Sequence, residues 1–159
     1  MEIRQIDQQD RKLINAFIIR QWYTMQMVVH GESIDLGTAD GFYAWDDGII
    51  GLITCRRLGE EMEILSLDSL HERQGIGTAL LDRVIGQAKE TGAGRIKLIT
   101  TNDNLSALRF YQKRGFDIIQ IYRNALDQAR KIKPEIPLIG MDGIPLKHEI
   151  ELEMLLSPD

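Results

Sequence analysis

Residues 70–84 read LHERQGIGTALLDRV, and here the sequence changes from a strand pattern to a helix pattern. Two glycines, Gly75 and Gly77, stand one residue apart and are followed by Thr78. Apolar residues then recur every four positions, as they do in an amphipathic helix (Ile76, Leu80, Val84 and Ala88). We therefore expect a strand that ends near residue 70, a short turn, and a helix that begins at one of the two glycines.

A helix that begins at a glycine can bind an anion. Its first N–H groups have no partner inside the helix, and together they carry roughly half a positive charge. Glycine lets these groups approach phosphate oxygens closely, and the side chains of Arg73 and Thr78 can add donors. A plain strand-to-helix turn, with glycine present for conformational reasons, explains the same residues. This stretch alone leaves both readings open.

Two common phosphate-binding patterns are absent from this stretch. The phosphate-loop pattern GxxxxGK[ST] requires a Gly-Lys pair, and none follows Gly75. The dinucleotide pattern GxGxxG has Leu80 at its third glycine position. A nucleotide-binding fold that uses residues 75–77 for ATP or NAD is therefore a weak alternative.

The sequence before residue 70 predicts a strand, a helix and then a run of strands. Residues 2–6 favour a strand, and residues 8–10 start an amphipathic helix that runs to about Met27. Residues 30–41, HGESIDLGTADG, are rich in turn-forming residues and predict a loop. Consecutive strands are expected at three places, the first two joined by an Asp-Gly turn (residues 42–45, 49–56 and 62–67).

The sequence after residue 70 alternates helices with strands. Asp103 or Asn104 can cap a second helix, which ends at Gly115. Further elements are expected on both sides of it (strands at 95–100, 116–122 and 149–154, and a helix at 124–131). Such alternation implies crossover connections and partly parallel pairing. We expect an α/β fold with a mixed, twisted sheet of about six to seven strands, helices on both faces, and one domain over residues 1–159.

Composition and charge exclude several classes of protein. The 159 residues suit one domain, and a hydrophobic share of 43% is enough for a buried core. The formal net charge of -5 gives no electrostatic reason to expect nucleic acid. Cys55 is the single cysteine, which excludes an internal disulfide, and no apolar run is long enough to cross a bilayer. From the single cysteine and the lack of such a run we expect a soluble, cytoplasmic protein. The histidines lack metal-ligand spacing, so we expect no metal.

A second motif, TTNDNLSALRFYQKRGF at residues 100–116, has Asn104 just before a helix and Tyr111 two turns inside it. Together with ERQGIGTALL at residues 72–81, it resembles the GNAT superfamily of N-acetyltransferases, whose loop reads [QR]xxGx[GA]. The resemblance runs from about residue 44 to residue 122, and the tail also looks like one branch of small members. At the first position of the loop this sequence has Glu72 instead of Gln or Arg.

The resemblance implies direct transfer of an acetyl group from acetyl-CoA to a primary amine. It implies that the backbone at the end of the strand pairs with pantetheine like an added strand (Leu67, Asp68 and Ser69). It also implies that the loop and the helix start hold the pyrophosphate (Arg73, Gln74, Gly75, Ile76, Gly77 and Thr78). Asn104 would bind the cofactor, cap its helix, or do both.

Three side chains are candidates for proton transfer. Tyr111 matches the usual acid of the superfamily, which would protonate the departing CoA thiolate; a core tyrosine is the structural alternative. Glu63 matches a position where some members have a base, and its alternative is a solvated acid at a hairpin end. Asp68 and Glu32 rank below Glu63 as bases, and Cys55 is expected to be a buried structural thiol.

The acceptor is expected to be a small-molecule or peptide amine, with no nucleic-acid or membrane partner and a possible homodimer. An acidic channel for polyamines is not expected, because the acids look scattered along the sequence. Trp22, Tyr23 and Met25 are expected mainly in the core, although one or two could line the acceptor pocket. The main alternative is a non-catalytic module that binds and senses acyl-CoA. Such a module would keep Gly75, Gly77 and Asn104 but would gain nothing from Tyr111.

Overall fold

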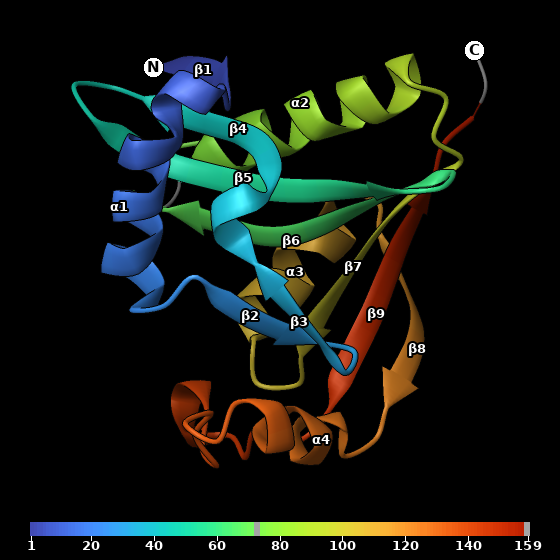
Figure 1. Ribbon diagram of the computed structural model, residues 1–159. Coiled ribbons are helices and arrows are strands. Elements are labelled where there is room, and N and C mark those ends of the chain that lie inside the picture. Colours follow the sequence, from blue (N-terminus) through green and yellow to red (C-terminus); the bar gives the residue numbers. More distant parts are fainter. Residues whose placement is uncertain (72–73, 158–159) are drawn as a thin grey trace. The chain divides into compact units, whose positions relative to one another are not determined.

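A computed structural model of the chain describes residues 1–71 and 74–157 (Figure 1). Over these residues the chain has nine strands, four α-helices and three short 3-10 helices. It divides into two compact units, and the first comprises residues 1–26, 35–96 and the C-terminal end from residue 156. The second unit comprises residues 27–34 and 97–155. One domain over residues 1–159 stays a prediction.

The first unit is built on an antiparallel sheet with the strand order β1-β4-β5-β6. Its elements are β1 (Glu2–Gln5), η1 (Gln8–Asp10), α1 (Arg11–Trp22), η2 (Leu36–Thr38), β4 (Asp40–Trp45), β5 (Ile49–Leu58), β6 (Glu61–Ser69) and α2 (Ile76–Glu90). The N–H of Gly94 donates to the carbonyl of Glu60 at 2.8 Å. The next strand, β7 (Arg95–Thr101), therefore begins beside the start of β6, as expected for parallel neighbours.

The two helices of the first unit cover opposite faces of this sheet. A Cβ added at Gly51 of β5 would lie 2.6 Å from the side chain of Ile76, so Gly51 faces α2. The indole Nε1 of Trp22 donates to Asp68 at 2.9 Å, so Asp68 of β6 faces α1. Gly51 pairs with Ser69, the next residue after Asp68, and neighbouring strand residues point to opposite faces. The expected helices on both faces are therefore present here.

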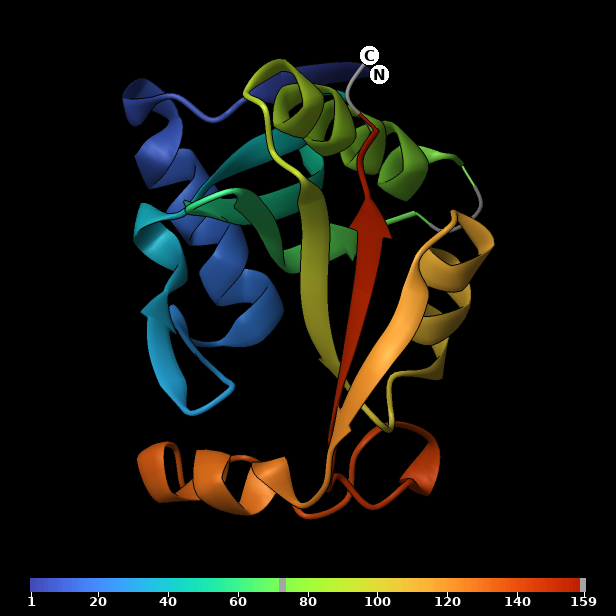
Figure 2. The ribbon, with the colours of Figure 1, turned by 90° about the vertical axis from the view of Figure 1, so that its right-hand side faces the viewer.

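The second unit has the strand order β7-β9-β8 (Figure 2). Its elements are the hairpin β2 (Gln26–Val29) and β3 (Glu32–Asp35), most of β7, α3 (Leu105–Lys113), β8 (Asp117–Tyr122), α4 (Ala125–Ile132), η3 (Met141–Gly143) and β9 (Glu149–Leu155). Strands β8 and β9 are antiparallel. With β7 common to both lists, the order of seven strands is β1-β4-β5-β6-β7-β9-β8. The predicted mixed α/β fold is confirmed.

The first helix is shorter than the sequence predicts. It ends at Trp22 instead of about Met27, because Tyr23 adopts a left-handed conformation with a φ of 61° and closes the helix. The predicted loop at residues 30–41 contains the second strand of a hairpin. His30 and Gly31 form its turn with φ values of 50° and 75°, the pattern of a type I′ turn.

Apolar side chains of the first unit form a core on both sides of its sheet. Residues from α1, β5 and α2 are almost fully buried (Ile14, Phe17, Leu52, Ile53, Leu80, Leu81 and Val84).

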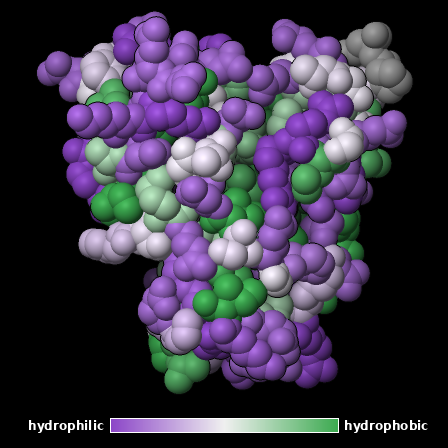
Figure 3. All heavy atoms as spheres, viewed as in Figure 1, coloured by the Kyte–Doolittle hydropathy of each residue, from purple (hydrophilic) through white to green (hydrophobic). Residues whose placement is uncertain are grey.

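In the view of Figure 3 the surface is mostly hydrophilic, with only small hydrophobic areas. Among the described residues, no helix combines the length and the hydrophobicity needed to span a membrane.

Candidate functional site

The C-terminal end of β6 turns part of its backbone away from β5. The N–H of Leu70 donates to the carbonyl of Ile50 in β5 at 2.8 Å. In an antiparallel pair, residues that exchange hydrogen bonds alternate with residues that do not. Asp68 therefore points its backbone groups toward β5, whereas Leu67 and Ser69 point theirs toward the other edge. Two of the three residues predicted to pair with pantetheine thus have the required backbone orientation.

A β-bulge precedes this segment. Thr54 of β5 pairs with Ser66, but the next residue, Cys55, pairs with Ile64, so Leu65 is an extra residue in β6. A bulge bends the strand and increases its local twist, and bulges are frequent next to active sites. The hydroxyls of Thr54 and Ser66 lie 2.5 Å apart in the buried interior and lock the register beyond the bulge. The direction of the last residues of β6 is therefore fixed.

The N-terminus of α2 presents backbone donors from a glycine start. Gly75 is the N-cap residue with a φ of 75°, a left-handed conformation that favours glycine, and a glycine has no side chain with which to cap this end. Gln74 and Gly75 are exposed, Gly77 and Thr78 are half-buried, and Ile76 is buried and anchors the helix. Among the described residues, a Cβ at Gly75 would meet no heavy atom within 4 Å. This arrangement suits an anion.

The segment between β6 and α2 is only partly described. Arg73, predicted as a pyrophosphate ligand, and Glu72 lie outside the described residues, and the expectations about them stay predictions. Before them, the hydroxyl of Ser69 donates to the carbonyl of His71 at 3.0 Å. The side chain of Ser69 therefore holds the first residues of this segment, while its backbone faces away from β5.

Asp68 combines burial with a neutral hydrogen-bond partner. Burial raises the pKa of the Asp68 carboxyl, and the hydrogen bond from Trp22 Nε1 partly offsets this increase. A carboxyl with a raised pKa at the end of β6 is suited to accept and release a proton. Sequence reasoning ranked it low because its indole partner, 46 positions away, left no local signal. Trp22 and Tyr23 are both exposed, contrary to the expected core position, and Tyr23 retains 89% of its accessible area.

Glu63, the predicted base, lies in the middle of β6 and is buried. Its Oε1 accepts a hydrogen bond from Nε of Arg56 at 2.7 Å, and the two residues are register partners across β5 and β6. The alternative of a solvated acid at a hairpin end is therefore wrong. A catalytic role for Glu63 stays a prediction beside this structural ion pair.

Cys55 is 1% exposed, as expected for a structural thiol. Burial raises the pKa of the Cys55 thiol to about 12. A thiol in this state supplies almost no thiolate at neutral pH, so Cys55 is unsuited to nucleophilic catalysis.

In the second unit, Asn104 and Tyr111 lie on α3. The side-chain oxygen of Asn104 accepts a hydrogen bond from the N–H of Ala107 at 3.1 Å, so Asn104, and not Asp103, is the helix cap. The ring of Tyr111 is buried and packs edge-to-face against Phe116 with centroids 5.3 Å apart. The capping and core roles are therefore present, and binding of the cofactor and protonation of the thiolate stay predictions.

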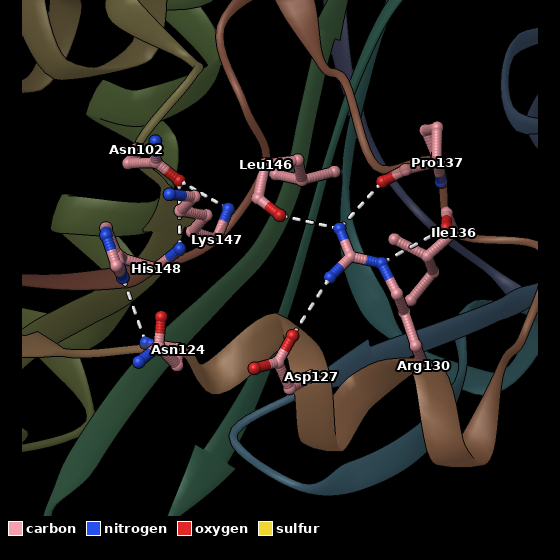
Figure 4. A network of polar contacts seen from close by, with 9 residues as sticks. All are labelled: Asn102, Asn124, Asp127, Arg130, Ile136, Pro137, Leu146, Lys147 and His148. Carbon is pink, nitrogen blue, oxygen red and sulfur yellow. Dashed lines mark hydrogen bonds and ion pairs between the residues drawn. The ribbon is translucent and has the colours of Figure 1, made fainter.

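Sequence reasoning gave no role to the polar contacts around the start of β9 (Figure 4). The Oδ1 of Asn102 accepts hydrogen bonds from the N–H groups of Lys147 and His148, both at 2.9 Å. Nδ1 of His148 in turn accepts from the N–H of Asn124 at 2.9 Å. These contacts fix the point where β9 begins and α4 starts.

Arg130 of α4 holds the long connection to β9 (Figure 4). Its guanidinium donates to the carbonyls of Leu146 at 2.6 Å, Pro137 at 2.8 Å and Ile136 at 3.3 Å. Asp127, one turn earlier on the same helix, lies 3.5 Å from the guanidinium. The side chain of Arg130 therefore binds the connection near its start and near its end.

Strand β9 carries an acidic row that sequence reasoning missed. Residues 149–153 read EIELE, so the three glutamates alternate with apolar residues and share one face of the strand. Glu149 and Glu151 are buried, and the hydroxyl of Tyr122 donates to Oε1 of Glu151 at 2.6 Å. The acids are therefore not scattered at this point. Their period of two was the available signal, and it was used only to predict a strand.

Comparison with known proteins gives one family and several similar structures. The model of the acetyltransferase (GNAT) family matches residues 5–116. The uncharacterised protein YdhI of Bacillus subtilis (strain 168) is 43% identical over 142 residues, which cover 88% of this chain and 89% of YdhI. A Bacillus subtilis acetyltransferase in complex with CoA has a TM-score of 0.71 at 20% identity and covers 98% of this chain and 99% of its own.

A third similar protein is a GNAT family acetyltransferase from Elizabethkingia anophelis with acetyl-CoA bound. Its TM-score is 0.70 at 23% identity, and the match covers 98% of this chain and 97% of that one. At this level of identity the two solved structures establish the fold alone. The family match spans more than half of the chain and includes the end of β6 and the start of α2. The chain therefore belongs to the acetyltransferase (GNAT) family.

Proposed function

We propose that this protein is an acetyl-CoA-dependent N-acetyltransferase that transfers the acetyl group directly to a primary amine. The proposal rests on one observation, that two sets of backbone groups follow each other along the chain in the first unit. The backbone of Leu67 and Ser69 turns away from β5 and is followed by the glycine-led start of α2. The first can pair with the amides of pantetheine, and the second can hold pyrophosphate oxygens. Two of the similar structures contain bound CoA or acetyl-CoA.

The reaction requires two proton movements. The amine nitrogen attacks the thioester carbonyl, the new C–N bond forms, and the C–S bond breaks as CoA leaves as a thiolate. A free amine has a pKa of about 10 and is mostly protonated at neutral pH, so a base must remove a proton. A backbone N–H of Leu67 or Ser69 would stabilise the oxyanion, a contribution of about 3 kcal/mol. Tyr111 would donate a proton to the thiolate.

Two carboxylates of β6 are candidates for the base. Glu63 is the position that the resemblance selects, but its carboxylate is held by Arg56. Asp68 is bound only by a neutral indole among its recorded side-chain contacts, and burial raises its pKa toward the working range. We favour Asp68 as the proton acceptor and keep Glu63 as the alternative.

A calorimetric titration tests cofactor binding. The purified protein is titrated with acetyl-CoA, CoA, ATP and NAD, and acetyl-CoA should bind with micromolar affinity while ATP and NAD do not. Gly77→Glu puts a carboxylate at the α2 N-terminus and should weaken acetyl-CoA binding by more than about a hundredfold. Gly86→Glu is the matched control, because Gly86 lies in the same helix with open space around it. Equal binding by both variants would reject the proposed pyrophosphate site.

The acyl-CoA sensing module remains the second candidate, because the burial and ring contacts of Tyr111 suffice to explain that residue without catalysis. Release of CoA thiol in the presence of an amine separates the two functions.

A cytoplasmic location and a homodimer stay predictions, and light scattering on the purified protein tests the dimer.

A further inference from the structure

Strand β8 is the edge strand of the second unit, and its edge is open and apolar. Among the described residues, no strand pairs with the side of β8 that faces away from β9 (Figure 2). Its sequence, DIIQIY, contains neither lysine nor proline, and three isoleucines retain much of their accessible area (Ile118 43%, Ile119 41% and Ile121 54%). Lysine and proline are residues that protect an edge strand from pairing with another chain. β8 is therefore suited to accept a further strand.

The edge strand of the first unit, β1, is protected in the ordinary way. It has only four residues, and its side chains Glu2 and Arg4 form an ion pair at 2.9 Å. Short length and charged side chains both discourage pairing with another chain. The open apolar edge is therefore a property of β8, and not of every edge strand in this chain.

The contacts at the start of β9 show which way its backbone groups point. The carbonyl of His148, just before β9, accepts a hydrogen bond from the N–H of Asn102, just after β7, at 3.0 Å. The carbonyl of the preceding residue, Lys147, accepts from the N–H of Leu126, beyond β8, at 3.1 Å. Backbone groups alternate in direction along a strand. The even-numbered residues of β9 therefore face β7, and the odd-numbered residues face β8.

The register of β8 against β9 then identifies the groups that face the open edge. Ile118 and Ile121 pair with even-numbered residues of β9, namely Leu152 and Ile150, and Ile119 is the extra residue of a β-bulge between them. The N–H and C=O groups of Ile118 and Ile121 therefore point away from β9. Because their two partners in β9 are two positions apart, the side chains of Ile118 and Ile121 lie on one face of the sheet.

A second copy of β8 in the antiparallel direction matches these outward groups. When Ile118 lies opposite Ile121 of the second copy, a two-fold axis also places Ile121 opposite Ile118 of that copy. Both pairs can then exchange N–H···O hydrogen bonds at once, because two copies of one strand have the same spacing across the bulge. The four isoleucine side chains lie on one face and pack across the junction of the two strands.

The charges at the two ends of β8 suit the same register. Asp117 and Arg123 are exposed, and among the described residues neither side chain forms a hydrogen bond or an ion pair. In the antiparallel pair, Asp117 lies opposite Tyr122 of the second copy, so Arg123 of that copy is only one position further along. Two pairs of opposite charge therefore flank the isoleucines, and such pairs favour one register over its alternatives.

We propose that two copies of this chain form a dimer by antiparallel pairing of their β8 strands, with Ile118 opposite Ile121 of the second copy. The inference gives the predicted homodimer a defined interface, and it does not rest on the proposed acetyl transfer. A pair of six-residue strands is a small interface. We therefore expect a dissociation constant of about 1–100 μM.

Sedimentation velocity over a series of micromolar concentrations tests the dimer. Ile121→Lys puts a charge into the interface twice, because of the two-fold axis, and should raise the dissociation constant about a hundredfold. Ile132→Lys is the matched control, because Ile132 is an exposed apolar residue at the end of α4, outside β8. It should leave the dissociation constant unchanged. A wild type that stays monomeric, or a dimer that persists in Ile121→Lys, would overturn the proposal.

Ile121→Pro separates pairing of the strands from simple contact between apolar side chains. The N–H of Ile121 faces the open edge, so proline removes no hydrogen bond to β9, and edge positions of this kind accept proline. The variant should stay folded by circular dichroism and should be monomeric. Ile121→Val keeps the N–H and should form dimers like the wild type. Equal association of the two variants would reject strand pairing; if Ile121→Pro does not fold, Ile118→Lys takes its place and should be monomeric.

An exchange of charges tests the register. Asp117→Arg and Arg123→Asp each bring like charges together at both ends of the interface, so each variant alone should associate about tenfold more weakly than the wild type. An equal mixture of the two variants restores both pairs of opposite charge and should recover the association. A mixture that associates no better than either variant alone would overturn the proposed register.

Discussion

The start of α2 and the start of β9 both present polar groups, but of opposite sign and by different means. The α2 start uses backbone N–H groups, exposed by glycine, and is suited to an anion. The β9 start has side-chain carboxylates on one face of an alternating strand. A site made of backbone groups leaves a glycine pattern in the sequence. A site made of alternating side chains looks like an ordinary strand until its neighbours are known.

Tyr111→Phe has the largest expected effect, because it tests whether a side chain of the second unit takes part in the proposed reaction. If Tyr111 protonates the thiolate, kcat for thiol release should fall about a hundredfold while acetyl-CoA affinity changes little. Phenylalanine keeps the edge-to-face packing on Phe116, so the fold should persist. Tyr23→Phe is the control, because Tyr23 is almost fully exposed. An unchanged kcat would leave the second unit with a binding role only and would favour the sensing module.

Asp68→Asn would sharpen the comparison, because it tests whether the first unit contributes a side chain to the reaction as well as backbone groups. As a base, Asp68 must be ionised, so wild-type kcat/KM should fall on the acid side of its raised pKa. Asparagine should lower kcat/KM about tenfold and remove that acid limb. A pH profile of both proteins, with Asp82→Asn on the exposed side of α2 as control, measures this. An acid limb that survives in Asp68→Asn would transfer the role of base to Glu63.

The same substitution has a defined effect on stability. Because burial raises the folded-state pKa of Asp68 above its unfolded value, the folded protein holds this proton more tightly. The resulting stabilisation is present below the unfolded pKa and is lost as the pH rises through the folded pKa. At neutral pH the ionised Asp68 therefore costs stability, and Asp68→Asn should unfold at an equal or higher temperature. A loss of activity together with a gain of stability would mark Asp68 as functional.

Gly51→Ala tests how strictly the anion-binding region depends on its backbone position. The added methyl would lie 2.6 Å from Ile76 and 3.1 Å from Leu80, so the first turn of α2 must move away from β5. We expect a loss of about 1–3 kcal/mol in the free energy of unfolding and weaker acetyl-CoA binding. Gly94→Ala is the control, since its new Cβ would have only an ordinary contact at 3.9 Å. Unchanged affinity would show that the α2 N-terminus does not set cofactor binding.

Arg130→Lys should have the smallest effect. Lysine keeps the charge but loses the planar fork that reaches the carbonyls of Ile136, Pro137 and Leu146. The free energy of unfolding in urea should fall by about 1–3 kcal/mol, and amide hydrogen exchange should rise within residues 133–146. Activity with monoamines should not change. A large loss of monoamine activity would show that this connection belongs to the catalytic machinery.

Features of the fold that depend on residues close together in the sequence were predicted more successfully than the others. The strand, turn and helix around Gly75 were predicted because the apolar period and the glycines are local signals. The capping role of Asn104 was one of two local choices. The helix end at Tyr23 was missed because a tyrosine with positive φ has no recognisable pattern. The hairpin at His30 was missed for a related reason, since His-Gly is an uncommon pair for that turn.

The side-chain contacts of the candidate site depended on distant partners and could not be predicted. Trp22 meets Asp68 across 46 positions, and His30 meets Glu149 across 119. Arg56 and Glu63 are only seven positions apart, but their pairing depends on the shifted register after the bulge. In each case the residue type suggested a possible function, and the fold supplied the partner that defines it.

Arg130 has a consequence for how this protein can diversify. Within the connection between α4 and β9, the guanidinium donates to main-chain oxygens, and every residue type has such an oxygen. Exposed side chains along this connection can therefore be exchanged with little effect on these contacts. The connection is thus a suitable position for grafting new recognition sequences onto an unchanged scaffold.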